Sequence, residues 1–247
     1  MTERRPRALV TGASRGIGRT VATRLAERGY SVTLSARNQE ALRDLAAELT
    51  ARGHSAAWLA ADMGAADDLD RLAAFQAGLD PGLDLLVLSA GVGTAAPVGE
   101  YTDRRVERQM RVNYFAPFHL IQALLPALRA AAQVNALGSA RIIALASLTG
   151  VVAEPGLAAY GASKAALISL CESVTIDEAG SGVTATAISP GYIDTDMSAW
   201  TQDLIPAEEM IRADDVGELV LALSRMSRYA AIPNIVLTRP GAQLWRA

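Results

Sequence analysis

Tyr160 and Lys164 are the residues whose types and spacing most clearly suggest chemistry. Lys164 is the only lysine; every other member of the 23 lysines and arginines is an arginine. Residues four positions apart on a helix share one face. An ammonium is a compact charge with three rotatable donors, whereas a guanidinium is a planar fork that does not deprotonate. The pair therefore favours a site in which the cation stabilises a phenolate, and the alternative is a solvated helix face.

A glycine-rich segment follows the first apolar run and precedes a stretch of helical period. It reads Thr11-Gly12-Ala13-Ser14-Arg15-Gly16-Ile17-Gly18. Glycines permit a tight turn and let backbone N–H groups approach a pyrophosphate, whose charge the helix N-terminus stabilises. Such a turn can also be simple punctuation, but its place between a first strand and a first helix favours dinucleotide binding.

The second apolar segment bears on which dinucleotide is bound. An NAD site usually has an acidic residue about 20 positions after the glycines, where it accepts hydrogen bonds from the ribose. This chain instead reads Ser35-Ala36-Arg37-Asn38. Arg37 and Arg15 are suited to clamp a 2′-phosphate, so we expect NADP(H); the alternative is that both arginines are solvated.

Short apolar runs alternate with longer stretches of helical period, which is typical of a parallel sheet built from repeated β-α units. We expect one domain over 1–247, an α/β fold with a doubly wound sheet of about seven strands and helices on both faces. Ligands of such a sheet bind at the carboxyl ends of its strands. The expected strands are 7–11, 31–36, 56–60, 83–89, 141–147, 183–189 and 234–238. The expected helices are 16–28, 39–52, 65–77, 104–131, 157–179 and 214–227.

Composition excludes several classes of protein. The 247 residues are 51% hydrophobic and 20% charged, with a formal net charge of −3, so a large core is available. The arginines are scattered and form no basic block that could bind along a phosphate backbone, so we expect no nucleic-acid partner. One cysteine, Cys171, allows no disulfide, and with two histidines it offers no customary zinc site. We expect Cys171 in the core, no membrane association and a cytoplasmic protein.

The expected helix 104–131 is apolar on more than one face, and Pro117 and Pro126 are expected to bend it. The helix after Tyr160 is also apolar and rich in small residues. We therefore expect these helices to pack against a second copy in a homodimer or homotetramer. The alternative is that both are covered within one chain.

Taken together, these motifs resemble those of the short-chain dehydrogenase/reductase family over nearly the whole chain. Ser147 lies 13 positions before Tyr160, the interval usual in that family, and Asn113 resembles its helix asparagine. Asp62 resembles the acidic residue at the adenine ring, and Pro190-Gly191 with Thr195 resembles the segment beside the nicotinamide. The resemblance implies a Rossmann fold, with cofactor contacts from Thr11, Gly12, Ser14, Arg15, Gly16, Ile17, Gly18, Arg37, Asp62, Met63, Ala90, Gly91, Tyr160, Lys164, Pro190, Gly191, Ile193 and Thr195.

The resemblance also implies a reaction in which hydride passes between nicotinamide and a carbonyl carbon while Tyr160 exchanges a proton with the carbonyl oxygen. Moving a phenol from a pKa near 10 to about 7 requires roughly 4 kcal/mol of preferential phenolate stabilisation. Lys164 is placed to supply much of it, and the oxidised nicotinamide adds to the effect. Lys164 is also implied to hold the nicotinamide ribose. Ser147 is implied to donate to the substrate oxygen, and Asn113 to hold a water that links Lys164 to solvent.

Some positions depart from the family pattern or bear on the substrate. The family commonly has Asn-Ala-Gly after the fourth strand, where this chain has Ser89-Ala90-Gly91. The segments 210–216 and 234–240 loosely resemble the serine and 3-hydroxy-acid dehydrogenase branch more than the fatty-acid reductase branch. We expect the loop near 192–211 to cover the substrate, with four substrate-facing candidates: Glu154, Tyr192, Met197 and Trp200.

The functional prediction is an NADPH-dependent oxidoreductase that reversibly reduces a ketone or aldehyde, with Tyr160 as proton donor and no metal. One alternative is a 3-oxoacyl-thioester reductase of fatty-acid or polyketide synthesis, with Arg104, Arg105 and Arg108 available to an extended substrate arm. Another is a dinucleotide-binding sensor without catalysis, which retention of Ser147, Tyr160 and Lys164 argues against. The substrate itself is not determined by a fold and a cofactor site.

Overall fold

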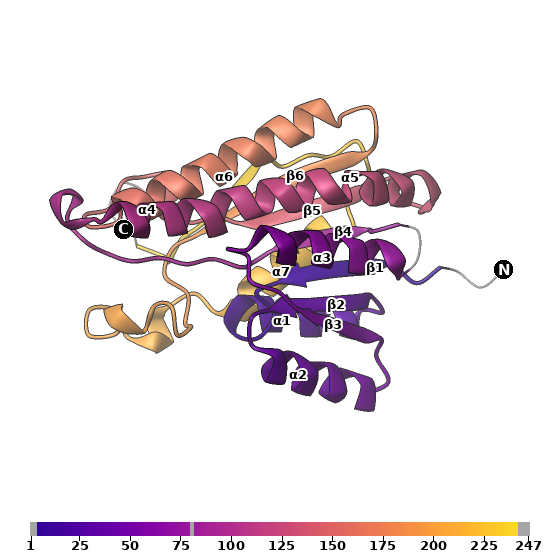
Figure 1. Cartoon of the computed structure of the whole chain (residues 1–247), viewed down its shortest axis with the longest axis horizontal. Coiled ribbons are helices and arrows are strands. Elements are labelled where there is room, and N and C mark those ends of the chain that lie inside the picture. Colours follow the sequence, from indigo (N-terminus) through magenta and orange to yellow (C-terminus); the bar gives the residue numbers. More distant parts are fainter. Residues whose placement is uncertain (1–3, 80–81, 242–247) are drawn as a thin grey trace.

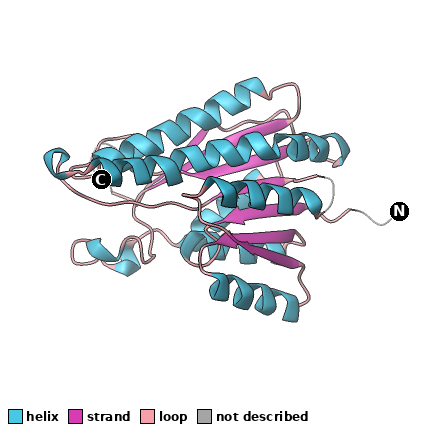
Figure 2. Cartoon of the chain, viewed as in Figure 1, coloured by secondary structure: helices cyan, strands magenta, loops and turns pink. Residues whose placement is uncertain are grey.

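The computed structural model describes residues 4–79 and 82–241, and its centre is a seven-stranded parallel sheet (Figures 1 and 2). The strand order is β3-β2-β1-β4-β5-β6-β7. The strands are β1 (Arg7–Thr11), β2 (Ser31–Ala36), β3 (Ala56–Ala60), β4 (Leu85–Leu88), β5 (Ala140–Leu145), β6 (Val183–Pro190) and β7 (Asn234–Leu237). The α/β prediction with a doubly wound sheet is confirmed.

Helices cover both faces of the sheet, and each face has its own apolar core. On one face lie α3 (Ala66–Gly78), α4 (Asp103–Met110), α5 (Ala116–Val134) and α6 (Ala158–Asp177). On the other lie α1 (Gly16–Glu27), α2 (Gln39–Ala51) and α7 (Ala213–Leu223). Alternate residues of β1 and β4 enter opposite cores, because successive side chains of a strand point to opposite faces. Cys171 of α6 is fully buried in the first core, as expected.

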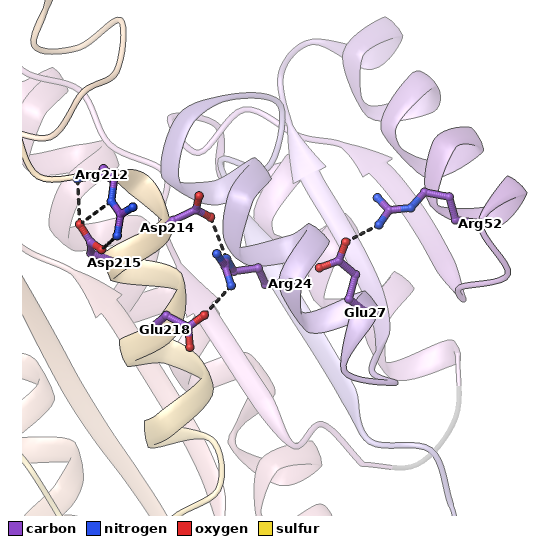
Figure 3. Close-up of polar contacts among 7 residues, drawn as sticks. All are labelled: Arg24, Glu27, Arg52, Arg212, Asp214, Asp215 and Glu218. Atoms are coloured by element: carbon purple, nitrogen blue, oxygen red, sulfur yellow. Dashed lines mark hydrogen bonds and ion pairs between the residues drawn. The ribbon is translucent and has the colours of Figure 1, made fainter. Parts of the chain in front are cut away.

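Ion pairs fasten the helices on the second face (Figure 3). Arg24 of α1 donates to Asp214 at 2.8 Å and to Glu218 at 2.5 Å, and both carboxylates belong to α7. A Cβ added at Gly217 would lie 2.7 Å from Arg24 Cδ, so a glycine there lets the arginine cross. Arg52, which follows α2, pairs with Glu27 of α1. These contacts hold α1, and hence the loop that precedes it, against the rest of the fold.

The segment expected as one helix over 104–131 consists of α4, a π-helical turn at Arg111–Phe115 and α5. Pro117 lies in the first turn of α5, directly after the π-helical turn, and Pro126 lies inside the helix. By length and composition, Asp103–Val134 is apolar enough to cross a membrane, with 44% of the tested window buried within the fold. Because α5 packs on α3 and β5, we interpret it as a core helix, which gives the same signal.

Other boundaries match the expected ones closely, and two differ for a physical reason. The expected helix 214–227 ends at Leu223, and the carbonyls of Met226 and Ser227 accept hydrogen bonds from Arg141 instead. The expected strand 141–147 ends at Leu145, so Ser147 lies beyond the strand and caps a short 3₁₀ turn, Leu148–Gly150.

The order of strands reverses between β1 and β4, and connections leave these strands on opposite sides. Such a switch point opens a crevice at the carboxyl ends of the strands. The start of α4 and the segment after β6 both extend beyond that edge of the sheet (Figure 1). The fold therefore brings the glycine-rich segment, the start of α6 and the expected covering loop to one side of the molecule.

Candidate active site

A cleft of about 1270 Å³ runs along this edge and is lined by segments from the whole chain. Of the residues predicted to bind cofactor, all line it except Thr11. Of the predicted catalytic residues, Ser147, Tyr160 and Lys164 line it, and Asn113 does not. All four predicted substrate residues line it: Glu154, Tyr192, Met197 and Trp200.

The glycine-rich turn is shaped by close backbone approaches. Gly12 and Gly16 have φ values of +67° and +52°, a region that L side chains rarely adopt. A Cβ added at Gly18 would lie 2.3 Å from the Gly12 carbonyl oxygen, and one at Gly12 would lie 2.9 Å from the Ala90 backbone. The turn therefore lies against the end of β4 and presents the N-terminus of α1 to the cleft, where it suits a phosphate.

Thr11 supports this turn from behind. Its Oγ1 accepts hydrogen bonds from the backbone N–H groups of Ser89 and Ala90, at 3.1 and 3.2 Å. The same hydroxyl donates to the Val87 carbonyl. Thr11 thus joins β1 to the segment after β4, where Ser89 departs from the family pattern. Thr11 was predicted to contact the cofactor, but its side chain does not line the cleft, because it points toward β4.

The two arginines expected at a 2′-phosphate differ in their surroundings. Arg37 lines the cleft beside Asn38 and Asp62, and it has no carboxylate partner among the described residues. Arg15 donates to Asp196 at 3.0 Å in an exposed ion pair. The Asp62 carboxylate accepts the Gly64 N–H at 2.8 Å. Arg37 is therefore the cation available at this end, whereas Arg15 links the glycine-rich turn to the segment after β6.

Lys164 is almost completely buried on α6, one turn after Tyr160. Its Nζ lies 5.6 Å from the centroid of the Tyr160 ring and donates to the Leu145 carbonyl at 2.6 Å. Burial lowers the pKa of Lys164 from 10.5 to about 8, because the charged form loses hydration. At pH 7 the amine therefore still carries a proton, and the two groups point to the same side as predicted.

The phenol of Tyr160 does not have the lowered pKa expected from the sequence. Burial raises the pKa of Tyr160 above its usual value of 10. Its hydrogen bond with Ser147 acts in the opposite direction, and the charge of Glu154 raises the pKa further. The free energy lost by burying a phenolate thus exceeds the stabilisation that the neighbouring protein groups provide. Lys164 lies beside the ring, but its Nζ is directed to the Leu145 carbonyl.

Ser147 is oriented by the turn that it caps. Its Oγ accepts hydrogen bonds from the N–H and the hydroxyl of Thr149, at 3.3 and 3.0 Å. Both contacts use the oxygen as acceptor, so the hydroxyl hydrogen is left for the hydrogen bond that lowers the pKa of Tyr160. The turn after β5 therefore supplies an oriented O–H beside Tyr160.

Asn113 lies in the π-helical turn and is fully buried. Its Oδ1 accepts the Val92 N–H at 2.9 Å, and its Nδ2 donates to the Val92 carbonyl and to Ser163 Oγ. A Cβ added at Gly91 would lie 3.4 Å from Lys164 Nζ and 3.5 Å from Asn113 Oδ1. The asparagine thus joins the segment after β4 to α6, directly behind the lysine.

The substrate candidates come from two segments that meet across the cleft. Tyr192 donates to the carboxylate of Glu154, and its ring makes an edge contact with Trp200 at 6.0 Å between centroids. Burial and the Glu154 charge both raise the pKa of Tyr192. Ile193 and Ile211 pair as a parallel bridge that closes the base of the loop. Trp200 belongs to this loop and remains 60% exposed, so it forms part of the outer wall of the cleft.

One wall of the cleft includes residues that were not predicted as cofactor contacts. Arg104, Glu107, Arg108 and Arg111 of α4 and the turn after it line the cleft, whereas Arg105 does not. Spacings of three, four and seven residues place them on one helix face, so helical periodicity was the signal that separates them from Arg105. This wall gives the cleft a positively charged side.

Comparisons with known proteins agree with this arrangement. The profile described as short chain dehydrogenase matches residues 6–204. The chain is 36% identical over 240 residues to the rhamnolipids biosynthesis 3-oxoacyl-[acyl-carrier-protein] reductase of Pseudomonas aeruginosa, covering 93% of each chain. It is 34% identical over 230 residues to a 3-oxoacyl-[acyl-carrier-protein] reductase of Staphylococcus aureus, covering 93% of this chain and 88% of that one.

Solved structures agree as well. The Pseudomonas aeruginosa RhlG/NADP active-site complex has a TM-score of 0.82, with 31% identity and 94% of each chain covered. A putative NAD(P) dependent gluconate 5-dehydrogenase from Beutenbergia cavernae, with bound NADP at low occupancy, also has a TM-score of 0.82, with 30% identity and 94% of each chain covered. The chain described here therefore belongs to the short-chain dehydrogenase family of oxidoreductases.

Proposed function

We propose that this protein is an NADPH-dependent reductase of ketones or aldehydes, working reversibly. The observation that carries the proposal is the convergence of Ser147, Tyr160 and Lys164 on the cleft that begins at the glycine-rich turn. The turn fits a dinucleotide, because its tight backbone approaches leave no room for side chains and expose a helix N-terminus. Arg37 favours a 2′-phosphate, and NADP is bound in the related structures named above.

In this mechanism each residue holds an atom or moves a proton. The cofactor, when bound, supplies hydride to the carbonyl carbon. When substrate is bound, Ser147 turns its hydroxyl hydrogen from Tyr160 to the carbonyl oxygen, and Tyr160 gives that oxygen a proton. Lys164, charged at pH 7, holds the nicotinamide ribose and favours the phenolate that remains. Asn113 fixes the segment behind Lys164, and we retain for it the role of holding a water beside the amine.

The raised pKa of Tyr160 suits the reducing direction, because the phenol stays protonated at neutral pH and is ready to donate. In the oxidising direction the phenol must first lose that proton. The positive charge of an oxidised nicotinamide would then favour its ionisation.

A 3-oxoacyl-thioester reductase is the second candidate, and the charged wall favours it. Arg104 and Arg108 line the cleft and have no ion-pair partner among the described residues. They offer an anionic substrate arm a place beside the cleft. The relatives from Pseudomonas aeruginosa and Staphylococcus aureus carry that activity in their names. A sensor without catalysis has no comparable support, since all three reactive groups are oriented.

The remaining proposals concern how the chain works as a whole. We propose that residues 1–247 form one domain that binds the dinucleotide and carries out catalysis, with the loop near 192–211 covering the substrate. We also propose that the protein works in the cytoplasm. We also propose a homo-oligomer formed through the helices of the first face. Phe115 and Phe118 support this, because they are 58% and 45% exposed at the start of α5. Sedimentation velocity tests the oligomer, and a monomer at micromolar concentration would contradict it.

The test of the activity is loss of NADPH absorbance with a panel of ketones, hydroxy acids and 3-oxoacyl thioesters. Tyr160→Phe is the critical variant. It should bind NADPH as the wild type does and lose most turnover, by about 10²- to 10⁴-fold, the contribution typical of a positioned acid. A Tyr160→Phe enzyme with normal turnover would show that another group donates the proton.

A further inference from the structure

The substrate end of the cleft contains a polar pair that the proposed reaction does not use, Glu154 and Tyr192. They lie 38 positions apart in the sequence and meet because the segment after β5 and the segment after β6 face each other. Tyr192 Oη donates to Glu154 Oε1. Among the described residues, Glu154 Oε2 has no hydrogen-bond partner, and both side chains line the cleft. The carboxylate is thus held by one oxygen and presents acceptor capacity to the cleft.

Glu154 also differs from the other charged groups at this end. Asp196, on the segment after β6, is paired with Arg15 and is exposed. Glu154 has no cation partner among the described residues, and its neighbours include the ring of Tyr192, which in turn contacts Trp200. Its charge reaches the reacting group, since it raises the pKa of Tyr160. A substrate whose carbonyl oxygen meets Tyr160 must therefore place its other groups within the field of this carboxylate.

Two physical effects follow for the substrate. A carboxylate on the substrate would meet a like charge in a partly buried site, where the repulsion is weakly screened. A hydroxyl on the substrate would instead donate to the free oxygen of Glu154 and satisfy an acceptor that loses water when the cleft is filled. Discrimination between substrates can come as much from such a repulsive element as from an attractive one.

We propose that Glu154, oriented by Tyr192, determines substrate specificity by favouring ketones and aldehydes that carry a hydroxyl near the carbonyl and by excluding those that carry a carboxylate. This inference rests on the proposed function, whose site it refines. It runs against the loose resemblance of the C-terminal segment to the 3-hydroxy-acid branch. Tyr192 is a positioning residue, because it acts through the carboxylate.

The test compares three small ketones of similar size with NADPH: 4-hydroxy-2-butanone, 4-methoxy-2-butanone and acetoacetate. We expect wild-type kcat/KM to be at least about tenfold higher for the hydroxy ketone than for acetoacetate, which is about 1.4 kcal/mol. Glu154→Gln should bring the two values within about threefold, mainly by improving acetoacetate, since the amide keeps the shape without the charge. Tyr192→Phe keeps the charge and removes the orientation. It should still exclude acetoacetate but lose the preference for the hydroxy over the methoxy ketone.

Glu172→Gln is the matched control, because Glu172 is exposed on α6 and does not line the cleft. It makes the same change of charge away from the cleft and should leave the three ratios as in the wild type. If Glu172→Gln and Glu154→Gln change the ratios equally, or if neither does, the proposal is overturned.

A binding measurement separates failure of this inference from failure of the proposed function. Calorimetry in the presence of NADP⁺ compares the binding of 1,3-butanediol and 3-hydroxybutyrate to the wild type and to Glu154→Gln. These compounds are the reduction products of 4-hydroxy-2-butanone and acetoacetate. Tighter binding of the diol that disappears in Glu154→Gln supports the specificity role even if no ketone is turned over, an outcome that would count against the reductase alone. Turnover of the ketones with equal affinities for diol and acid in both proteins would support the reductase and overturn the role of Glu154.

Discussion

Replacing Lys164 by methionine should make the stability of the protein depend less on pH, as well as abolishing its activity. Burial lowers the pKa of this amine from 10.5 to about 8. The unfolded chain holds the proton more tightly than the folded protein, so burial of the charged lysine destabilises the fold, and the full cost is present below pH 8. That cost is relieved as the pH rises from 8 toward 10.5. Methionine fills a similar volume without a charge.

The magnitude follows from the shift. The fall in the pKa of Lys164 from 10.5 to about 8 corresponds to about 3 kcal/mol at pH 7, of which about 1 kcal/mol remains at pH 10. The free energy of unfolding of the wild type should therefore rise by about 2 kcal/mol relative to Lys164→Met between these two pH values. The lost hydrogen bond to the Leu145 carbonyl costs the variant about 1–3 kcal/mol, but this cost does not depend on pH.

Urea unfolding followed by circular dichroism at pH 7, 8, 9 and 10 measures this difference directly. Other buried groups also make the stability depend on pH, among them Tyr160 and Cys171, because burial raises their pKa values above those of the unfolded chain. They are present in both proteins, so the comparison removes most of their effect. A stability difference that stays constant over this range would refute the reasoning, because it would mean that Lys164 titrates alike in the folded and unfolded chains.

Three further substitutions test other parts of the site. Lys164→Arg keeps the charge but should lose most kcat, since a planar fork cannot contact both the ribose and the Leu145 carbonyl in a pocket shaped for an ammonium; wild-type kcat would contradict this. Arg37→Ala should raise KM for NADPH by about tenfold or more and leave KM for NADH nearly unchanged, given charge-assisted hydrogen bonds of about 1.5–3 kcal/mol; equal KM values for both cofactors in the wild type would rule out the preference. Gly18→Ala, whose Cβ would lie 2.3 Å from the Gly12 carbonyl, should abolish dinucleotide binding measured by NADPH fluorescence.

The prediction for Tyr160 shows what spacing can and cannot establish. A spacing of four residues on a helix was enough to predict that the phenol and the amine lie on one side of that helix, and the structure confirms this. The pKa of the phenol was predicted in the wrong direction, because it depends on burial and on groups outside the helix. Ser147 and Glu154, which act on it in opposite directions, belong to the segment between β5 and α6 and reach the phenol only in the folded chain.

Thr11 and Asn113 are motif residues that support the cleft from behind. Both belong to recognisable motifs, and both lie behind the cleft, where they hold the backbone after β4. A motif identifies residues that the site needs, but it does not separate those that touch a ligand from those that position its walls. Only the directions of the side chains in the fold make that distinction.

By itself the sequence determined the local features: the strands and helices, the glycine turn and the helical pairing of Tyr160 with Lys164. These follow from apolar periodicity, backbone sterics and spacing within one element, all of which act between residues close in the chain. Tertiary structure alone decided the contacts between Arg15 and Asp196, 181 positions apart, and between Glu154 and Tyr192, 38 positions apart. Such contacts depend on how loops from different strands meet at one edge of the sheet, and burial at that edge then sets the pKa values on which the chemistry relies.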